Sequence, residues 1–377
     1  MSFGAILERI NPWRNRRLET YILRQCLITI GGTLAIITSV IFLIDYVEVS
    51  KNLGQRADLT SIHVIGLLFL KSPNVILVLL PFVFLFGTLG AFVSLNRRSE
   101  LVAMRAAGVS AWRFVLPAAG MAFLIGVLTI TIFNPIASSL GERYDQIQNT
   151  IEGKDIVANG EGGIIYLRQG EDNKQTVIRA MVGQTGNQLT NATFWTYVLD
   201  DKGTPQFESR IDAGEAILKP GTWQLKNARE AFVGEPVREY AALSIESTLN
   251  PRNAFHKRAS PQSTPFWKLP LLIRQIENSG FTAAPYILRL HQLLATPVMF
   301  AAMAALGAVF SLRLMRLGGM ARLAVSGVGL GFAVFFVNQL CGAMGKAEVI
   351  PIFLAGWATP VLALLSAMTL LVYTEDG

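Results

Sequence analysis

The chain has 377 residues, of which 51% are hydrophobic and 16% are charged, and its formal net charge is +7. A soluble protein carries about a quarter charged residues, so much of the apolar surface of this chain is expected to face lipid. The basic residues stand near the ends of apolar runs rather than in one patch, so nucleic acid is not an expected partner. Cys26 and Cys341 predict no disulfide framework and no Cys-x-x-Cys metal or redox site, and no cofactor is expected.

The first apolar run, residues 21–44, is long enough to cross a bilayer as a helix. It is too long for the hydrophobic core of a cleaved signal peptide. Arginines precede it, which predicts a cytoplasmic N-terminus. They are Arg9, Arg14, Arg16, Arg17 and Arg24. Asp45 and Glu48 are then expected at the outer interface, before a polar connection that contains Lys51 and Arg56.

The second apolar stretch, residues 61–95, is too long for one simple span. Pro73 and Pro81 are expected to kink it. We predict a helical lead-in at residues 62–70 and a crossing at residues 73–95. Lys71 stands at the joint, either as an anchor whose charge reaches the interface or as a cation that faces an anionic ligand.

A short polar segment, residues 97–110, separates this stretch from the next apolar run at residues 114–136. Ser99 is a suitable N-cap, Glu100 suits the first turn of a helix, and Gly108 suits its C-terminal end. Leu101, Met104 and Ala107 share one face, which leaves Met104 free to fill the pocket of a partner. The segment is either a turn between two spans or a cytoplasmic coupling helix that docks into a soluble partner.

Composition changes after the third span, which is expected to end at Asn134-Pro135. Residues 141–266 contain no spanning run, and alternating stretches near residues 163–168, 176–182, 194–199, 215–218 and 222–226 predict strands. We predict an antiparallel sandwich or roll, a periplasmic jellyroll-like domain inserted between two sets of helices. This part has no cysteine and only His256, so neither a metal site nor a Ser-His-Asp triad is expected.

The last part of the chain, residues 267–377, predicts a short surface helix at residues 268–279 and three more spans. These spans cover residues 284–312, 324–342 and 350–373. Arg313, Arg316 and Arg322 mark the loop between the first two as cytoplasmic. The fold class is therefore an α-helical membrane protein with six transmembrane helices, both termini cytoplasmic. Residues 1–140 hold the first three helices.

Two kinds of chemistry have no support in the sequence. A Gly-x-x-x-x-Gly-Lys-Ser/Thr phosphate loop is missing, so ATP hydrolysis and other enzyme activity are not expected of the chain itself. No carboxylate stands in the middle of a span, where ion-driven carriers keep such groups. Arg289 is a cation near the start of the fourth span that either reaches the interface or lines a cavity. The Gly327-x-x-x-Gly331 pair allows close helix packing, either within one bundle or at an interface that opens.

Residues 98–110, Arg-Ser-Glu-Leu-Val-Ala-Met-Arg-Ala-Ala-Gly-Val-Ser, resemble the coupling segment of the LptF/LptG permeases. Residues 325–332, leading to Asn338 and Gln339, are similar to the fifth helix of that family. The order of three spans, a β-domain and three spans is also similar over essentially the whole chain, and the likeness is greater to the LptG branch.

The resemblance implies a subunit of the lipopolysaccharide-export ABC transporter in the bacterial inner membrane. Such a subunit pairs with the paralogous permease LptF over two LptB ATPases. It takes lipopolysaccharide from the outer leaflet and passes it to its jellyroll, to LptC and to the periplasmic bridge. The first and fifth helices would form lateral gates. The residues that match the ATPase-coupling segment are Arg98, Ser99, Glu100, Leu101, Met104, Arg105 and Gly108.

The resemblance matches the substrate contacts less closely than the coupling segment. Some relatives carry lysines on the first helix that meet lipid phosphates, whereas this chain has Phe42 there. We therefore expect Lys51, Arg56 and Lys71 to replace them, with Arg289 as a further cation. Several strand residues are candidate walls of a trough for acyl chains, or simply core residues. They are Ile165, Leu167, Phe194, Val198, Trp223 and Leu225.

Two other functions fit the composition. An ion-gradient-driven secondary transporter of an amphiphile would need no ATPase. A membrane scaffold for periplasmic proteins would transport nothing. The missing intramembrane acids disfavour the first, and the segment at residues 97–110 disfavours the second.

Overall fold

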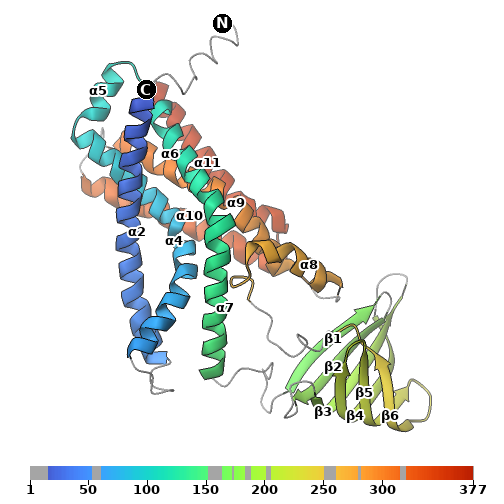
Figure 1. Cartoon of the computed structure of the whole chain (residues 1–377). Helices are drawn as coiled ribbons and strands as arrows, with labels where there is room; N and C mark the ends of the chain where they lie inside the picture. The colour runs from blue at the N-terminus through green and yellow to red at the C-terminus, as the bar shows by residue number, and fades with distance from the viewer. Residues whose placement is uncertain are drawn as a thin grey trace.

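The computed structural model describes residues 16–52, 61–151, 164–171, 174–182, 188–200, 205–249, 260–278, 282–314 and 320–376. Arg9, Arg14, Arg56, His256 and Arg316, named above, lie outside these ranges. A bundle of long helices forms one part of the molecule, and a β-sheet stands beyond one end of it (Figure 1). We call this end of the bundle the sheet end.

Six helical spans of the described residues are long and apolar enough to cross a membrane. Three precede the sheet: α2 (Arg16–Asn52), α4 (Ser61–Arg97), and α6 (Trp112–Leu128) continued by η2 (Thr129–Phe133) and α7 (Asn134–Ile151). Three follow it: α9 (Ala284–Leu314), α10 (Met320–Lys346) and α11 (Ile352–Asp376). Long apolar helices are confirmed at all six predicted spans, because a helix satisfies its own backbone hydrogen bonds and is therefore the structure expected of a long apolar run.

Two predicted boundaries are wrong. The expected lead-in and crossing at residues 62–95 form one continuous helix, α4, with Pro73 and Pro81 inside it. The third span also continues past Asn134-Pro135 into α7. Pro135 has no N–H, so the Thr131 carbonyl four residues earlier lacks its usual donor. Trp267 Nε1 donates to that oxygen at 3.2 Å.

The short helix α8 (Leu269–Asn278) confirms the prediction of a surface helix before the fourth span. A single 3₁₀ turn, η3 (Phe266–Lys268), leads into it. The Phe266 N–H donates to Asn134 Oδ1 at 2.9 Å. The start of α8 is therefore fixed to α7 beside the proline.

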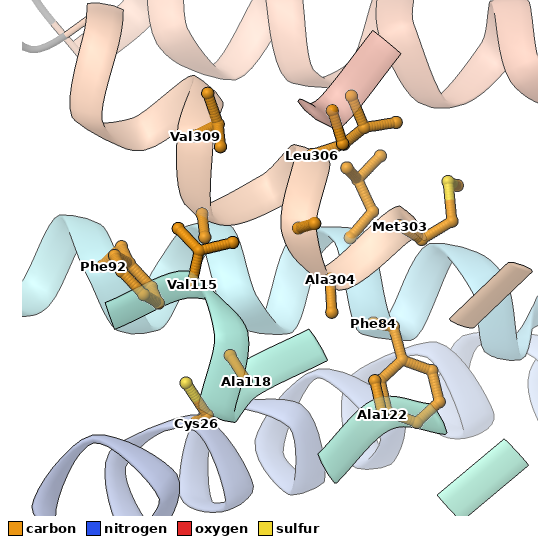
Figure 2. Packing of buried hydrophobic residues seen from close by; sticks show 14 of the residues in the cluster. Cys26, Phe84, Phe92, Val115, Ala118, Ala122, Met303, Ala304, Leu306 and Val309 are labelled. Carbon is orange, nitrogen blue, oxygen red and sulfur yellow. The ribbon is translucent and has the colours of Figure 1, made fainter. Parts of the chain in front are cut away.

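The helix bundle is organised around α9, the most buried of the six spans. Its small and medium side chains pack against Phe84 and Phe92 of α4 and against Ala118 and Ala122 of α6 (Figure 2). Gly307 of α9 lies against the backbone of α4 near Leu85. Small residues let these helices approach closely, which is how apolar helices gain packing energy in lipid.

The Gly327 and Gly331 face of α10 also packs on α4, where added Cβ atoms would meet Leu89, Leu85 and Phe82. The side of α10 that faces away from α4 remains exposed, as does most of the surface of α2. These two helices are the least buried of the six spans. Their exposed apolar side chains, such as Ile36 and Phe332, need lipid or another protein chain to cover them.

The described strands form one antiparallel sheet in the order β1-β2-β3-β4-β5-β6. They are β1 (Ile164–Glu171), β2 (Lys174–Val182), β3 (Gln188–Leu199), β4 (Pro205–Lys219), β5 (Thr222–Phe232) and β6 (Arg238–Glu246). Sequence neighbours are sheet neighbours throughout, so the sandwich or jellyroll is not confirmed. β6 was missed because its alanines and charged residues do not alternate clearly.

The sheet is curved enough for its first and last strands to meet at one end. Gln169 of β1 accepts a hydrogen bond from Trp223 Nε1 of β5 at 3.1 Å and donates to the Glu246 carbonyl of β6 at 3.0 Å. Ser247 Oγ also donates to Gln169 Oε1, at 2.8 Å. This polar junction ties β1 to β6 around an apolar core that contains Ile165, Phe194 and Leu225.

Candidate functional site

The segment between α4 and α6 folds as a seven-residue helix, α5 (Glu100–Ala106). It lies at the end of the bundle opposite the sheet, near the C-terminus and the start of α2 (Figure 1). Ser99 occupies the N-cap position of α5 as expected, but the expected side-chain cap is not formed. It adopts a left-handed conformation with φ of 60° and its side chain makes no capping hydrogen bond.

The other end of α5 agrees with the prediction. Gly108 has φ of 79°, a value that suits glycine. The Val109 N–H donates to the Met104 carbonyl at 3.1 Å, and the Gly108 N–H donates to the Arg105 carbonyl at 2.9 Å. This pair of bonds is the Schellman motif that closes a helix.

The two faces of α5 have different surroundings. Leu101 is 2% exposed and belongs to the core of the bundle, and Met104 packs against that core. The face that we expected to fill a partner's pocket is thus turned toward this chain's own helices. Val102, 59% exposed, and Ala103 and Ala106 form the outward face.

Three hydrogen bonds connect this segment to other helices. Tyr21 Oη of α2 donates to Glu100 Oε2 at 2.7 Å. Arg105 Nη2 donates to the Thr374 carbonyl near the end of α11 at 3.2 Å. The Ala111 N–H, just before α6, donates to Glu375 Oε2 of α11 at 2.7 Å. These bonds connect α5 to α2 and α11, and they connect the start of α6 to α11.

At the sheet end, a charged cluster joins α2 to α4. Lys71 Nζ lies 2.8 Å from Asp45 Oδ1 and 3.1 Å from Glu48 Oε2. Asp45 is 5% exposed, and its Oδ2 atom has no hydrogen-bond partner among the described residues. Lys71 is thus a cation held by two carboxylates rather than one that is free for an anionic ligand.

Apolar side chains surround this cluster. Val49, Val64, Leu67 and Leu68 form a small core between α2 and α4, with Phe42 and Tyr144 packed against it. Phe42 also meets Phe69 edge to face, with ring centroids 5.2 Å apart. Phe42 and Lys71 therefore belong to one contact between these helices.

The remaining candidates lie elsewhere. Lys51 is exposed near the end of α2. Arg289 is partly buried in α9, and its Nε atom has no hydrogen-bond partner among the described residues. Trp223 is fully buried in the sheet, where it packs edge to face against Phe194. The trough role expected for Trp223 is thus not supported by its position, which is that of a core residue.

The sequence did not reveal which residues contact α5 and Lys71. Tyr21, Thr374 and Glu375 carry no local signal of their contact with the segment at residues 97–110. Asp45 and Glu48 could have been found, because two acids one helical turn apart at the end of a span call for a cation on a neighbouring helix. The described residues contain no group of three or more His, Cys, Asp or Glu side chains that could hold a metal ion.

Comparisons with known proteins found a matching family and similar curated proteins. The profile of the family described as lipopolysaccharide export system permease LptF/LptG matches residues 20–373. Two similar curated proteins are the lipopolysaccharide export system permease protein LptG of Escherichia coli strain K12 and that of E. coli O6:H1 strain CFT073. Each is 22% identical over 343 residues, which cover 89% of this chain and 92% of the relative.

Proposed function

Because the chain belongs to the LptF/LptG family of lipopolysaccharide export permeases, we propose that it is the LptG-like subunit of an ABC transporter in the inner membrane. In this proposal it takes lipopolysaccharide from the outer leaflet and passes it through its β-domain to the periplasmic bridge. The end of the bundle with α5 and both termini lie in the cytoplasm, and the sheet lies in the periplasm. The ATPase is a separate partner.

The observation that carries the proposal is the set of hydrogen bonds around α5. An ATPase that pushes on Val102 and Ala106 would move a rigid element, because Leu101 anchors α5 in the core. Bonds to Thr374 and Glu375 would pass that movement to α11, and the bond between Glu100 and Tyr21 connects the docking segment to α2. Motion of packed helices as rigid bodies is the common way in which such an input reaches a distant site.

Exposed surfaces of the described residues support the proposed partners. The exposed apolar sides of α2 and α10 suit a second permease, LptF, with a lipid path between the two chains. The outward face of α5 suits one of two LptB ATPases. In the described residues β1 and β6 are the outer strands of the sheet and meet at one end, so the rest of either edge suits LptC or another β-domain, which would add a strand there.

Replacing Glu100 with lysine tests the ATPase contact. We propose that the Glu100 carboxylate binds a cationic side chain of the ATPase. We therefore expect the ATPase to bind at least ten times more weakly to the variant, because the lysine would repel that cation. Tenfold corresponds to about 1.4 kcal/mol. The amount of ATPase that copurifies with the permease pair measures the effect.

Glu277→Lys is a matched control, since Glu277 is exposed on α8 at the sheet end. Normal copurification of the ATPase with Glu100→Lys would refute the docking site. Export without any ATPase, driven by an ion gradient, would refute the transporter class as a whole.

Substrate recognition is proposed to use the cations that no carboxylate holds in the described structure. Lys51 and Arg289 fit this description better than Lys71. The Lys51→Gln/Arg289→Gln variant is expected to bind lipopolysaccharide about ten times more weakly, since ion-assisted hydrogen bonds to phosphate are lost. Binding to the permease complex in nanodiscs measures this, with Arg274→Gln on α8 as the control. Equal binding by the double variant and the control would remove both residues from the substrate site.

A further inference from the structure

Glu100 is already engaged within this chain. The Tyr21 hydroxyl donates to its Oε2 atom at 2.7 Å, and the bond is open to solvent. Tyr21 is 38% exposed, and Glu100 is half-buried. The carboxylate that the proposed ATPase contact requires is therefore held by α2 when no ATPase is present.

We propose that Tyr21 and the docked ATPase compete for the Glu100 carboxylate, so that docking releases the base of α2. The proposal rests on the proposed function, in which Glu100 meets a cationic side chain of the ATPase. A phenol offers one hydrogen bond, whereas a guanidinium offers two parallel bonds and a full positive charge. The net contribution of a solvent-exposed hydrogen bond is small, so the stronger partner displaces the phenol.

The backbone of α5 holds Glu100 in position for this exchange of partners. Leu101 is buried in the bundle core, and the closing motif at Gly108 fixes the far end of the helix. Glu100 stands in the first turn, and the left-handed Ser99 before it makes no side-chain cap. Arg98 is also close enough to Tyr21 to interact with it electrostatically. The phenol thus keeps a polar neighbour when Glu100 turns away.

The release would act on a helix whose surface is largely exposed. Ile22, Cys26 and Ile30 fix one side of α2 in the bundle core, while Leu27, Ile28 and much of the rest of the helix are exposed. Breaking the bond at Tyr21 removes a polar contact between this end of α2 and α5, while the apolar packing of Ile22 and Cys26 remains. Docking of the ATPase would then change the contacts of α2 before any nucleotide is hydrolysed.

A set of conservative variants of the permease pair tests the competition. In nanodiscs, Tyr21→Phe is expected to bind the ATPase about five times more tightly than the wild type, since the competing hydroxyl is gone. That factor corresponds to about 1 kcal/mol at 1.4 kcal/mol per tenfold. Glu100→Gln is expected to bind more weakly, and the double variant should match Glu100→Gln, because no carboxylate remains to be contested.

Tyr46→Phe is the control, because Tyr46 lies on the same helix with 39% exposure and is expected to leave the affinity unchanged. A second readout is the lipid released per ATP hydrolysed, which should fall for Tyr21→Phe although the ATPase binds better. Unchanged or weaker binding by Tyr21→Phe, with Glu100→Gln still weak, would overturn the competition and leave the docking site intact. Wild-type binding by Glu100→Gln would overturn the docking site and the competition together.

Discussion

Replacing Lys71 with methionine is expected to destabilise the protein by about 3–5 kcal/mol, because it removes the charge that compensates a buried carboxylate. Asp45 is 5% exposed, and its Oδ1 atom lies 2.8 Å from Lys71 Nζ while its Oδ2 atom already lacks a partner among the described residues. Methionine keeps much of the apolar stem of lysine. The loss of stability would therefore reflect the missing charge and not a change in packing. Thermal unfolding of the purified protein, followed by tryptophan fluorescence, measures the change.

The paired substitution makes this test specific. Asp45→Asn together with Lys71→Met removes both charges, and we expect it to recover most of the lost stability. Lys51→Met is the control, because Lys51 is exposed on the same helix as Asp45 and should be nearly neutral. If Lys71→Met unfolds at the wild-type temperature, or if Asp45→Asn gives no recovery, then the cluster does not hold α2 against α4.

The cluster of Lys71, Asp45 and Glu48 is important because it is a polar contact that positions α2 near one end of the helix, as the Tyr21 bond does near the other. Tyr21 and Asp45 are separated by a helical rise of about 36 Å at 1.5 Å per residue, slightly more than the roughly 30 Å hydrocarbon core. One contact joins α2 to α5, and the other joins it to α4. Release at the α5 end with retention at Lys71 would let α2 pivot about its sheet end, which is a movement suited to a lateral gate.

Replacing Gly307 with alanine is the second large effect that we expect, a loss of about 3 kcal/mol. A Cβ atom there would meet the Leu85 carbonyl oxygen and the Thr88 hydroxyl, and it would lie 3.1 Å from the Leu89 backbone nitrogen. Backbone atoms cannot move aside as a flexible side chain can, so α9 and α4 would have to separate. Because α9 is the centre of the bundle, this change should lower both the apparent melting temperature and the yield of monodisperse protein.

Gly329→Ala provides the matched control on α10. No atom lies within 4 Å of a Cβ placed there, so the substitution adds only the higher helix propensity of alanine and should be neutral or slightly stabilising. Opposite signs for two identical substitutions would assign the effect to the α4–α9 contact. Equal effects of Gly307→Ala and Gly329→Ala would contradict that assignment.

The sequence by itself determined the six spans, the surface helix before the fourth of them, and the inserted antiparallel strands. These features depend on local composition, since long apolar runs must be helical in lipid and alternating runs fit a pleated surface. It also marked residues 97–110 as distinctive, and Gly108 closes α5 as predicted. The coupling role of that segment stays a prediction.

Only the tertiary structure decided how these elements meet. It paired Lys71 with Asp45 and Glu48, turned Leu101 inward and Val102 outward, buried Trp223, and continued the third span past Pro135 with the help of Trp267. Each of these outcomes depends on the rotation and register of one packed element against another. Residues far apart in the chain set that rotation through close packing, which a local pattern of residue types does not encode.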